Sequence, residues 1–174
     1  MSVDLLTGDD FTDLFRTFEH TAFRLETRAA YGIPEEDEPF QRFLRGEEPP
    51  SDWLRPWLDL ITEQTRQGKR VERVRLIDEP PSDYLRFEVW STPLNLQAGE
   101  DIRYLPRRRA LELQLPKYDY WLFDSRRLAM MHFDHAGRFQ GAEIVEDPRT
   151  VVQHAYWRDT AWHYATPYQA FVES

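Results

Sequence analysis

The stretch YDYWLF at residues 118–123 is apolar at positions that would face both sides of a strand. A short run that is apolar on both faces is typical of a strand in the middle of a sheet. The polar residues at 124–127 then supply a turn, and two further strand-like segments follow at 128–133 and 139–145. The sequence DHAG at 134–137 between them is typical of a hairpin turn. We therefore expect a central strand followed by an antiparallel hairpin.

Further strands are expected on the N-terminal side of this stretch. Residues 21–26 and 71–77 alternate apolar and polar side chains, which predicts strands. In the first of them Phe23 and Leu25 face one way, and Arg24 and Glu26 face the other, although a continued helix is the alternative there. Strand-like patterns also occur at 83–89, 101–105 and 110–115. For residues 83–89 a helical turn is the alternative.

Helical spacing marks both ends of the chain. One apolar stripe at i, i+3, i+4 and i+7 predicts a first helix, and its members are Phe11, Leu14, Phe15 and Phe18. Shorter stripes predict helices around 40–44 and 53–61. Asp147 followed by Pro148 is typical of a helix start, so a final helix is expected from there.

Together these elements predict an α+β fold, with N-terminal helices and a C-terminal helix packed on a mainly antiparallel sheet. The proline-rich stretch at 46–50 is the one candidate domain boundary. The segments on either side of it are not large enough to form separate stable domains readily. Residues 1–174 are therefore expected to form a single globular domain.

Composition excludes several classes of function. The chain has 174 residues, 22 Lys+Arg, 31 Asp+Glu, a formal net charge of -9 and no cysteine. Without cysteine, disulfide scaffolds, Cys-ligated metal sites and thiol nucleophiles are excluded. The acidic balance argues against direct binding to nucleic acid. No apolar run approaches the ~18–20 residues of a membrane span, and no signal-peptide pattern is found, so we expect a cytoplasmic protein without membrane contact.

Arginine and acidic residues alternate repeatedly on the expected strands, and 20 of the 22 cationic residues are arginine. Arginine makes bidentate contacts to carboxylates and phosphates that lysine cannot make. One interpretation is a surface or pocket that binds a partner or a small anionic ligand. The alternative is a solvated face with weak ion pairs, each worth under ~1 kcal/mol. The candidate binding residues are Arg24, Glu26, Tyr84, Arg86, Glu100, Asp101 and Arg103.

Motifs for catalysis are few. The chain contains no Gly-x-Ser-x-Gly motif, phosphate loop or dinucleotide-binding fingerprint. His132 and Asp134 would share one face of a strand, and with a further histidine they could ligate non-haem iron. The alternative is that Asp134 shapes a hairpin turn. The sequence therefore assigns no catalytic residue, no metal site and no cofactor, and enzymatic activity stays open.

Four segments carry a resemblance to a known family: FEHTAFRLETRAAY at 18–31, VRLIDEPPSDYLR at 74–86, NLQAGEDIR at 95–103 and DYWLFD at 119–124. Taken together they resemble domain of unknown function 6879, an uncharacterised actinobacterial family, over nearly the whole chain. Its members are often encoded beside Xre-type helix-turn-helix regulators. The resemblance implies a small cytoplasmic protein in a regulatory pair, such as a toxin–antitoxin pair, and it brings no catalytic residues.

Two main hypotheses about function follow. The first is a non-catalytic regulatory or protein-interaction module that binds a helix-turn-helix transcription regulator. This hypothesis agrees with the absence of catalytic motifs. It also agrees with the negative net charge, because an acidic protein could compete with DNA for the basic surface of the regulator. The second is a small-molecule-binding protein or enzyme with a polar pocket lined by arginine, glutamate and tyrosine. Convergence of the candidate side chains in one concave pocket would favour the second hypothesis.

Overall fold

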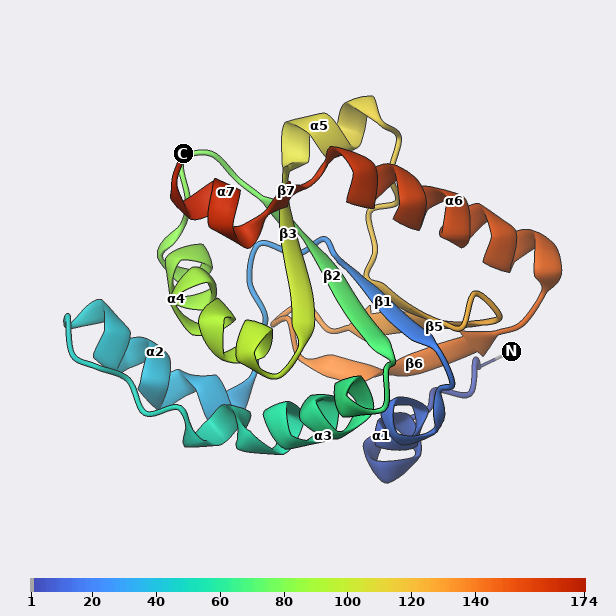
Figure 1. Cartoon of the computed structure of the whole chain (residues 1–174), viewed down its shortest axis with the longest axis horizontal. Coiled ribbons are helices and arrows are strands. Elements are labelled where there is room, and N and C mark those ends of the chain that lie inside the picture. Colours follow the sequence, from blue (N-terminus) through green and yellow to red (C-terminus); the bar gives the residue numbers. More distant parts are fainter. Residues whose placement is uncertain (1) are drawn as a thin grey trace.

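A mixed seven-stranded sheet organises the chain (Figure 1). The computed structural model describes residues 2–174, and its strands lie in the order β6-β5-β4-β1-β2-β3-β7. β1 pairs in parallel with β2, and β2 with β3, whereas every other neighbouring pair is antiparallel. The strands are β1 (Thr21–Glu26), β2 (Arg70–Ile77), β3 (Glu100–Pro106), β4 (Tyr120–Phe123), β5 (Arg127–Phe133), β6 (Phe139–Val145) and β7 (Thr166–Pro167).

Helices precede, connect and follow the strands. The helix α1 (Gly8–Thr17) comes before β1, and α4 (Asp83–Gln97) connects β2 to β3. The long connection from β1 to β2 holds η1 (Pro34–Glu36), α2 (Asp37–Leu44), η2 (Asp52–Leu54) and α3 (Arg55–Arg66). Such crossovers are needed because parallel neighbours cannot be joined by a hairpin. After β3 come α5 (Arg107–Glu112), α6 (Pro148–Tyr164) and α7 (Tyr168–Val172). The predicted α+β fold is confirmed.

The strand formed by residues 120–123 lies in the interior of the sheet, as its apolar sequence predicts. β4 lies between β1 and β5, and all its residues are buried. Trp121 and Phe123 join a core that includes residues of α1 and α3, whereas Tyr120 and Leu122 join a core on the α6 side. The predicted hairpin is also confirmed, because β5 pairs antiparallel with β6.

Alternation along β1 sorts its side chains between the two faces of the sheet. Phe23 and Leu25 belong to the core on the α6 side, with Val151 and Ala161 of α6. Ala22 belongs to the opposite core, together with residues of the first predicted helix and of α3, which are Leu14, Phe15, Phe18 and Ile61. Figure 1 shows α6 and the pair α1 and α3 on opposite sides of the sheet. Because side chains alternate along a strand, Arg24 and Glu26 face the same helices as Ala22.

Two predicted strands are wrong. Residues 83–89 begin the helix α4, whose start is fixed by the Ser82 side chain accepting a hydrogen bond from the Leu85 N–H at 3.1 Å. Residues 110–115 lie at the end of α5 and in the turn after it. The apolar alternation there does not follow burial, since Leu111 is 54% exposed while Ala110 and Leu115 are buried.

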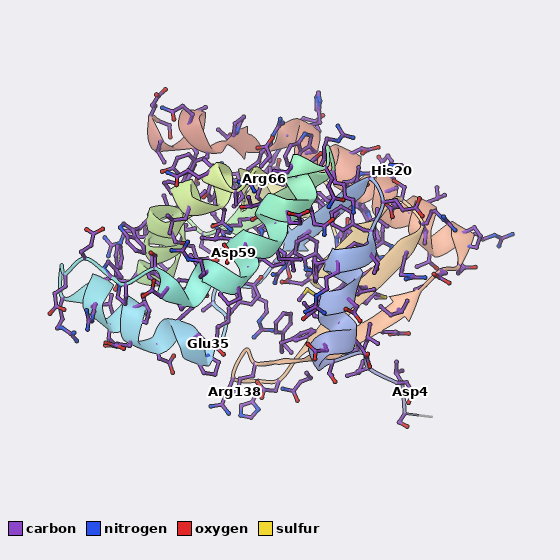
Figure 2. All side chains as sticks on the ribbon, turned by 60° about the horizontal axis from the view of Figure 1, so that its bottom comes forward. Asp4, His20, Glu35, Asp59, Arg66 and Arg138 are labelled. Atoms are coloured by element: carbon purple, nitrogen blue, oxygen red, sulfur yellow. The ribbon has the colours of Figure 1, made fainter. Side chains whose placement is uncertain are left out.

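The loop between β1 and η1 is held against the β5–β6 turn. The Gly32 N–H donates to the Gly137 carbonyl at 2.9 Å. A Cβ atom on Gly32 would lie 2.6 Å from the Ala136 carbonyl oxygen, so glycine permits this close approach. In Figure 2 the labels Glu35 and Arg138 mark these two regions near each other at the lower edge of the view. The contact places η1 and the residues before it beside the end of the sheet.

Candidate functional site

Arg24 and Glu26 lie on the face of the sheet that α1 and α3 cover, with side chains 14% and 5% exposed. Glu26 accepts hydrogen bonds from Arg73 Nη1 at 2.5 Å and from Arg75 Nε at 2.9 Å, both on the neighbouring strand β2. Burial alone would raise the pKa of Glu26, but Arg75, Arg73 and Arg24 outweigh it and lower the pKa to about 2. The interpretation of these alternating charges as a solvated outer face is therefore wrong for this part of the sheet.

Glu100, at the start of β3, extends this network. Its side chain is fully buried and accepts from Arg73 Nε at 2.8 Å. Asn95 of α4 donates to it at 2.8 Å, and the indole N–H of Trp57 donates at 3.2 Å. The side chains of two parallel strands, of α3 and of α4 thus meet at one carboxylate.

Asp119 joins the same network to the loop after β1. Its buried carboxylate accepts from Arg24 Nη2 at 3.0 Å and from the Tyr31 hydroxyl at 2.6 Å. The backbone N–H and the hydroxyl of Thr27 donate to its other oxygen at 2.8 and 2.7 Å. The Asp119 carboxylate therefore compensates the positive charge of Arg24 and also holds the loop that follows β1.

A buried polar stripe of α4 faces this region. Its members follow one another at helical spacing and line the pocket described below: Tyr84, Glu88, Ser91 and Asn95. The Tyr84 hydroxyl donates to Glu36 Oε2 at 2.6 Å, which joins α4 to η1. Burial raises the pKa of Glu36 to about 7 despite that hydrogen bond, and burial raises the pKa of Glu88 to about 8 although Arg75 acts against it.

These side chains surround a pocket of about 270 Å³ between the sheet and the helices. Figure 2 brings forward α3, marked by Asp59 and Arg66, on the helix-covered side of the sheet. The wall combines charged groups with aromatic rings and a few apolar side chains. It is lined by Phe11, Phe15, Arg24, Glu26, Tyr31, Ile33, Glu36, Trp53, Leu54, Trp57, Arg73, Arg75, Tyr84, Phe87, Glu88, Ser91, Asn95, Trp121 and Met131.

The structure brings together four of the seven candidate residues from the sequence analysis. Arg24, Glu26 and Tyr84 line the pocket, and Glu100 bonds to its arginine and asparagine. The remaining three lie elsewhere. The exposed Arg86 pairs with Asp83, and Asp101 is exposed. Arg103 stacks on the Trp162 ring at 3.8 Å and donates to its carbonyl, on the α6 face of the sheet.

Several pocket residues were missed by sequence reasoning. Glu36 lay in a run of acidic residues typical of a solvated loop, and Glu88 and Asn95 lay on a segment predicted as a strand or not assigned. One signal was present for α4, because polar residues recur at i, i+4, i+7 and i+11 from Tyr84. Such a stripe is ordinarily exposed, so its burial could not be inferred from spacing.

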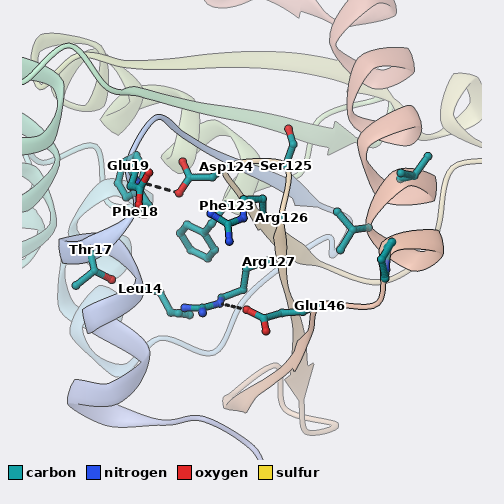
Figure 3. A pocket seen from close by; sticks show the side chains of 13 residues that line it. Leu14, Thr17, Phe18, Glu19, Phe123, Asp124, Ser125, Arg126, Arg127 and Glu146 are labelled. Atoms are coloured by element: carbon teal, nitrogen blue, oxygen red, sulfur yellow. Dashed lines mark hydrogen bonds and ion pairs between the residues drawn. The ribbon is translucent and has the colours of Figure 1, made fainter.

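A larger groove of about 650 Å³ lies between α1 and the start of α6 (Figure 3). Its polar groups already bond to one another. The Asp124 carboxylate accepts from the backbone N–H groups of Glu19, His20 and Thr21, and Arg127 pairs with Glu146 at 2.7 Å. The groove is therefore a weaker candidate site than the pocket above, despite its greater volume.

His132 and Asp134 do not come together around a metal position. The exposed His132 lies 3.7 Å from Glu143, between Nε2 and Oε2. Asp134 accepts from the backbone N–H groups of Ala136 and Arg138 at 2.9 and 3.0 Å, so it shapes the hairpin turn. Within residues 2–174, no group of three histidine, cysteine or acidic side chains is placed to hold a metal ion.

The raised pKa values of Glu36 and Glu88 predict that stability falls as the pH rises from about 5 to about 8. A carboxyl whose pKa is higher in the folded chain than its ordinary 4.5 binds more protons when folded. Its contribution to stability is complete below pH 4.5 and is lost as the pH passes through the folded value.

Urea denaturation at pH 5.5 and 8.5 measures this loss. The wild type should lose at least about 1.4 kcal/mol more than the double variant Glu36→Gln and Glu88→Gln, which is the equivalent of one pKa unit. The pKa of His154 is lowered by burial and acts in the opposite direction, but it does so in both proteins. Equal pH slopes for the two proteins would contradict the prediction.

Comparison with protein families identifies a match over most of the chain. The model of a family described as "Domain of unknown function (DUF6879)" matches residues 9–173. No curated protein matches the chain. Within residues 2–174, no helix has both the length and the apolar character needed to cross a membrane.

Proposed function

Because the chain belongs to the DUF6879 family, whose description assigns no activity, we propose its function from the pocket: it binds a small organic molecule between the sheet and the helices α3 and α4. Ligand sites are commonly clefts of roughly 300–1,000 Å³ with mostly apolar walls and a few well-placed polar groups. At about 270 Å³, this pocket suits a compact ligand.

The observation that carries the proposal is the combination of three guanidinium groups, three carboxyl groups and several aromatic rings around one pocket. Burying charges is costly, and a well-packed apolar interior of similar volume is often at least as stable. Shifted carboxyl pKa values such as those of Glu36 and Glu88 also cluster at functional sites. These features favour a binding role over a purely structural one.

Unpartnered donors at the pocket wall support the same proposal. Arg24 Nε and Trp53 Nε1 are buried and have no hydrogen-bond partner within residues 2–174. Buried polar atoms in folded proteins almost always have a partner, from the protein or from ordered water. A water molecule in the pocket, or an acceptor atom of a bound molecule, would satisfy such a donor.

A fragment screen tests the proposal. Small polar and aromatic compounds screened by thermal shift should include some that stabilise the protein, by about 2.7 kcal/mol at 100 times their Kd. Three tryptophans line the pocket, so titrations can follow tryptophan fluorescence. Filling the pocket with Ser91→Phe should abolish binding, whereas Arg86→Ala on the exposed side of α4 should retain it. The proposal fails if no compound stabilises the wild type, or if the Ser91→Phe variant binds the same compounds equally well.

A second candidate function is the binding of a protein partner. Val152 and Tyr156 are 67% and 64% exposed and lie one turn apart on α6, beside a shallow groove with Arg149. Such exposed apolar and aromatic residues with a neighbouring arginine are typical of contact surfaces. In this role the protein would act in the cytoplasm of an actinobacterium as the partner of a helix-turn-helix regulator. Size-exclusion chromatography with a co-encoded regulator should then give a complex that Tyr156→Ser weakens; no complex at micromolar concentration would contradict it.

A further inference from the structure

Charges on the sheet side of the pocket are balanced. The guanidinium groups of Arg24, Arg73 and Arg75 each lie within 3.0 Å of a carboxylate oxygen. The carboxylates are those of Glu26, Glu100 and Asp119, which are buried with the arginines. Three positive charges therefore face three negative charges, and this side offers no net charge to a ligand.

The helix side of the pocket adds two carboxyl groups: Glu88 shares Arg75 with Glu26, and Glu36 forms no ion pair within residues 2–174. Glu36 accepts one hydrogen bond, from Tyr84 to Oε2, and within residues 2–174 its Oε1 has no hydrogen-bond partner. The carboxyl of Glu88 accepts no hydrogen bond from the described part of the chain, and its separation from Arg75 is 3.6 Å between Nε and Oε2. Both side chains are largely removed from solvent, Glu36 being 9% exposed and the Glu88 side chain 14%.

Aromatic rings are distributed in the same uneven way. On the sheet side, the ring of Trp121 already faces two guanidinium groups, and Tyr31 and Trp57 each face one, at 5.3 to 5.9 Å. On the helix side, Tyr84, Phe87 and Trp53 form one aromatic group, with centroid distances of 5.9 and 6.4 Å. No guanidinium or ammonium group of residues 2–174 lies over these three rings.

We infer that the ligand of this pocket is a small organic cation, whose protonated amine lies between the carboxyls of Glu36 and Glu88 and whose apolar body contacts Trp53, Tyr84 and Phe87. This inference rests on the proposed function and names the ligand class. An ammonium group is attracted to carboxylates and to the faces of aromatic rings. On the helix side Glu36 has a carboxylate oxygen without a hydrogen-bond partner, Glu88 shares its one cation with Glu26, and within residues 2–174 no cation lies over the three rings. The small anionic ligand expected from the arginine content stays a prediction, and the experiment below tests it directly.

Protonation of the two carboxyls makes the binding depend on pH. Without a ligand, burial favours their neutral forms, with pKa values of about 7 and about 8. A cation between them favours the ionised forms, so its affinity should rise with pH until both are ionised. An alkyl ammonium, with an ordinary pKa of about 10.4 in lysine, keeps its charge over that range. The charged and titratable groups that act on the two carboxyls are Arg73, Arg75, Glu26, Asp37 and Tyr84.

Three probes of nearly equal size separate the ligand classes: 2-phenylethylamine, 2-phenylethanol and 3-phenylpropionate. Their binding to the full chain is measured by isothermal titration calorimetry and tryptophan fluorescence. At pH 8.0 the amine should bind at least tenfold more tightly than the alcohol, and the propionate should bind more weakly than the alcohol. Between pH 6.0 and 8.5 the affinity for the amine should rise at least fivefold, while that for the alcohol changes less than twofold.

Variants connect this selectivity to the two carboxyls. Glu88→Gln should reduce the preference for amine over alcohol to below threefold and flatten the pH profile. Asp101→Asn, which removes an exposed carboxylate outside the pocket, should leave both unchanged. Glu36→Gln keeps an acceptor for Tyr84 and serves as the second variant if Glu88→Gln does not fold, and the wild-type pH profile requires no variant.

Each outcome decides the inference. If the alcohol or the propionate binds as tightly as the amine, the assignment of the ligand as a cation is overturned. If Ser91→Phe abolishes that binding, the pocket still binds small molecules. If Glu88→Gln and Glu36→Gln both still prefer the amine over the alcohol, the position of the ammonium group between these two carboxyls is overturned. Absence of binding by all three probes would also overturn the inference, and the fragment screen would then decide separately whether the pocket binds any small molecule.

Discussion

Replacing Glu26 by glutamine is expected to lower the free energy of unfolding by about 3–5 kcal/mol, the range measured when one partner of a buried ion pair is removed. Glutamine has nearly the same shape as glutamate, so little volume is lost. What changes is the charge that compensates Arg73 and Arg75, whose side chains are only 9% and 8% exposed. Solvent cannot take over this role at such depth. Arg73 keeps its bond to Glu100, but the three guanidinium groups then face only two of the three carboxylates on the sheet side, so a buried positive charge loses its compensation.

Urea denaturation followed by circular dichroism measures this loss, with Glu112→Gln as the matched control. Glu112 forms an exposed ion pair with Arg109 at 2.7 Å, and its removal should change stability by less than ~1 kcal/mol because solvent screens both charges. A Glu26→Gln variant within 1 kcal/mol of the wild type would show that the buried network contributes no more than surface pairs do.

Replacing Asp119 by asparagine is expected to cost a similar 3–5 kcal/mol and also to loosen the loop after β1. All four groups around the Asp119 carboxylate are donors: Arg24, the Tyr31 hydroxyl, and the backbone N–H and hydroxyl of Thr27. Asparagine offers one acceptor oxygen and one NH₂ group, so at least one donor would face another donor. The positive charge of Arg24 would also lose its closest compensating carboxylate.

Denaturation and hydrogen exchange together test this second prediction. Amide exchange should accelerate in residues 27–33, which Asp119 holds through Thr27 and Tyr31, more than in the helix α7, which packs against β3 instead. Asp83→Asn is the control, since Asp83 is 54% exposed and pairs only with Arg86 at the surface. Unchanged exchange in residues 27–33 would mean that the Gly32 contact with the β5–β6 turn alone holds the loop.

Hydrophobic periodicity correctly predicted two kinds of helix or strand. In the first kind, one side is apolar and the other is polar; in the second kind, both sides are apolar. The α1 stripe, the alternation of β1 and β2, and the doubly apolar β4 are such cases. The helix α4 is the opposite case, because both of its sides are covered: its Leu85 and Val89 pack with Ile77 and Ile102 of the sheet, while Tyr84 and Glu88 line the pocket. Polar residues recur at helical spacing from Tyr84, but residues 83–89 also alternate between apolar and polar, and that shorter pattern indicated a strand.

The candidate site was predicted in part for a related reason. Strand alternation correctly placed Arg24 and Glu26 on one face, because side-chain direction in a strand depends only on position. Whether that face is covered depends on helices far away in sequence, and spacing contains no information about it. Arg86 and Asp101 carry the same residue types as the pocket side chains but point to solvent, since α4 and β3 turn their other sides toward the core.

By itself, the sequence determined the class of the fold, its central strand and hairpin, and the absence of thiol chemistry, because these follow from local periodicity and composition. Only the tertiary structure decided that the arginine–glutamate alternation is buried. Packing of α3, α4 and η1 over β1, β2 and β3 removes water from those charges, and the effective strength of an ion pair depends on that removal. The excess of acidic residues noted in the composition is also present at the pocket, where five carboxyls accompany three guanidinium groups.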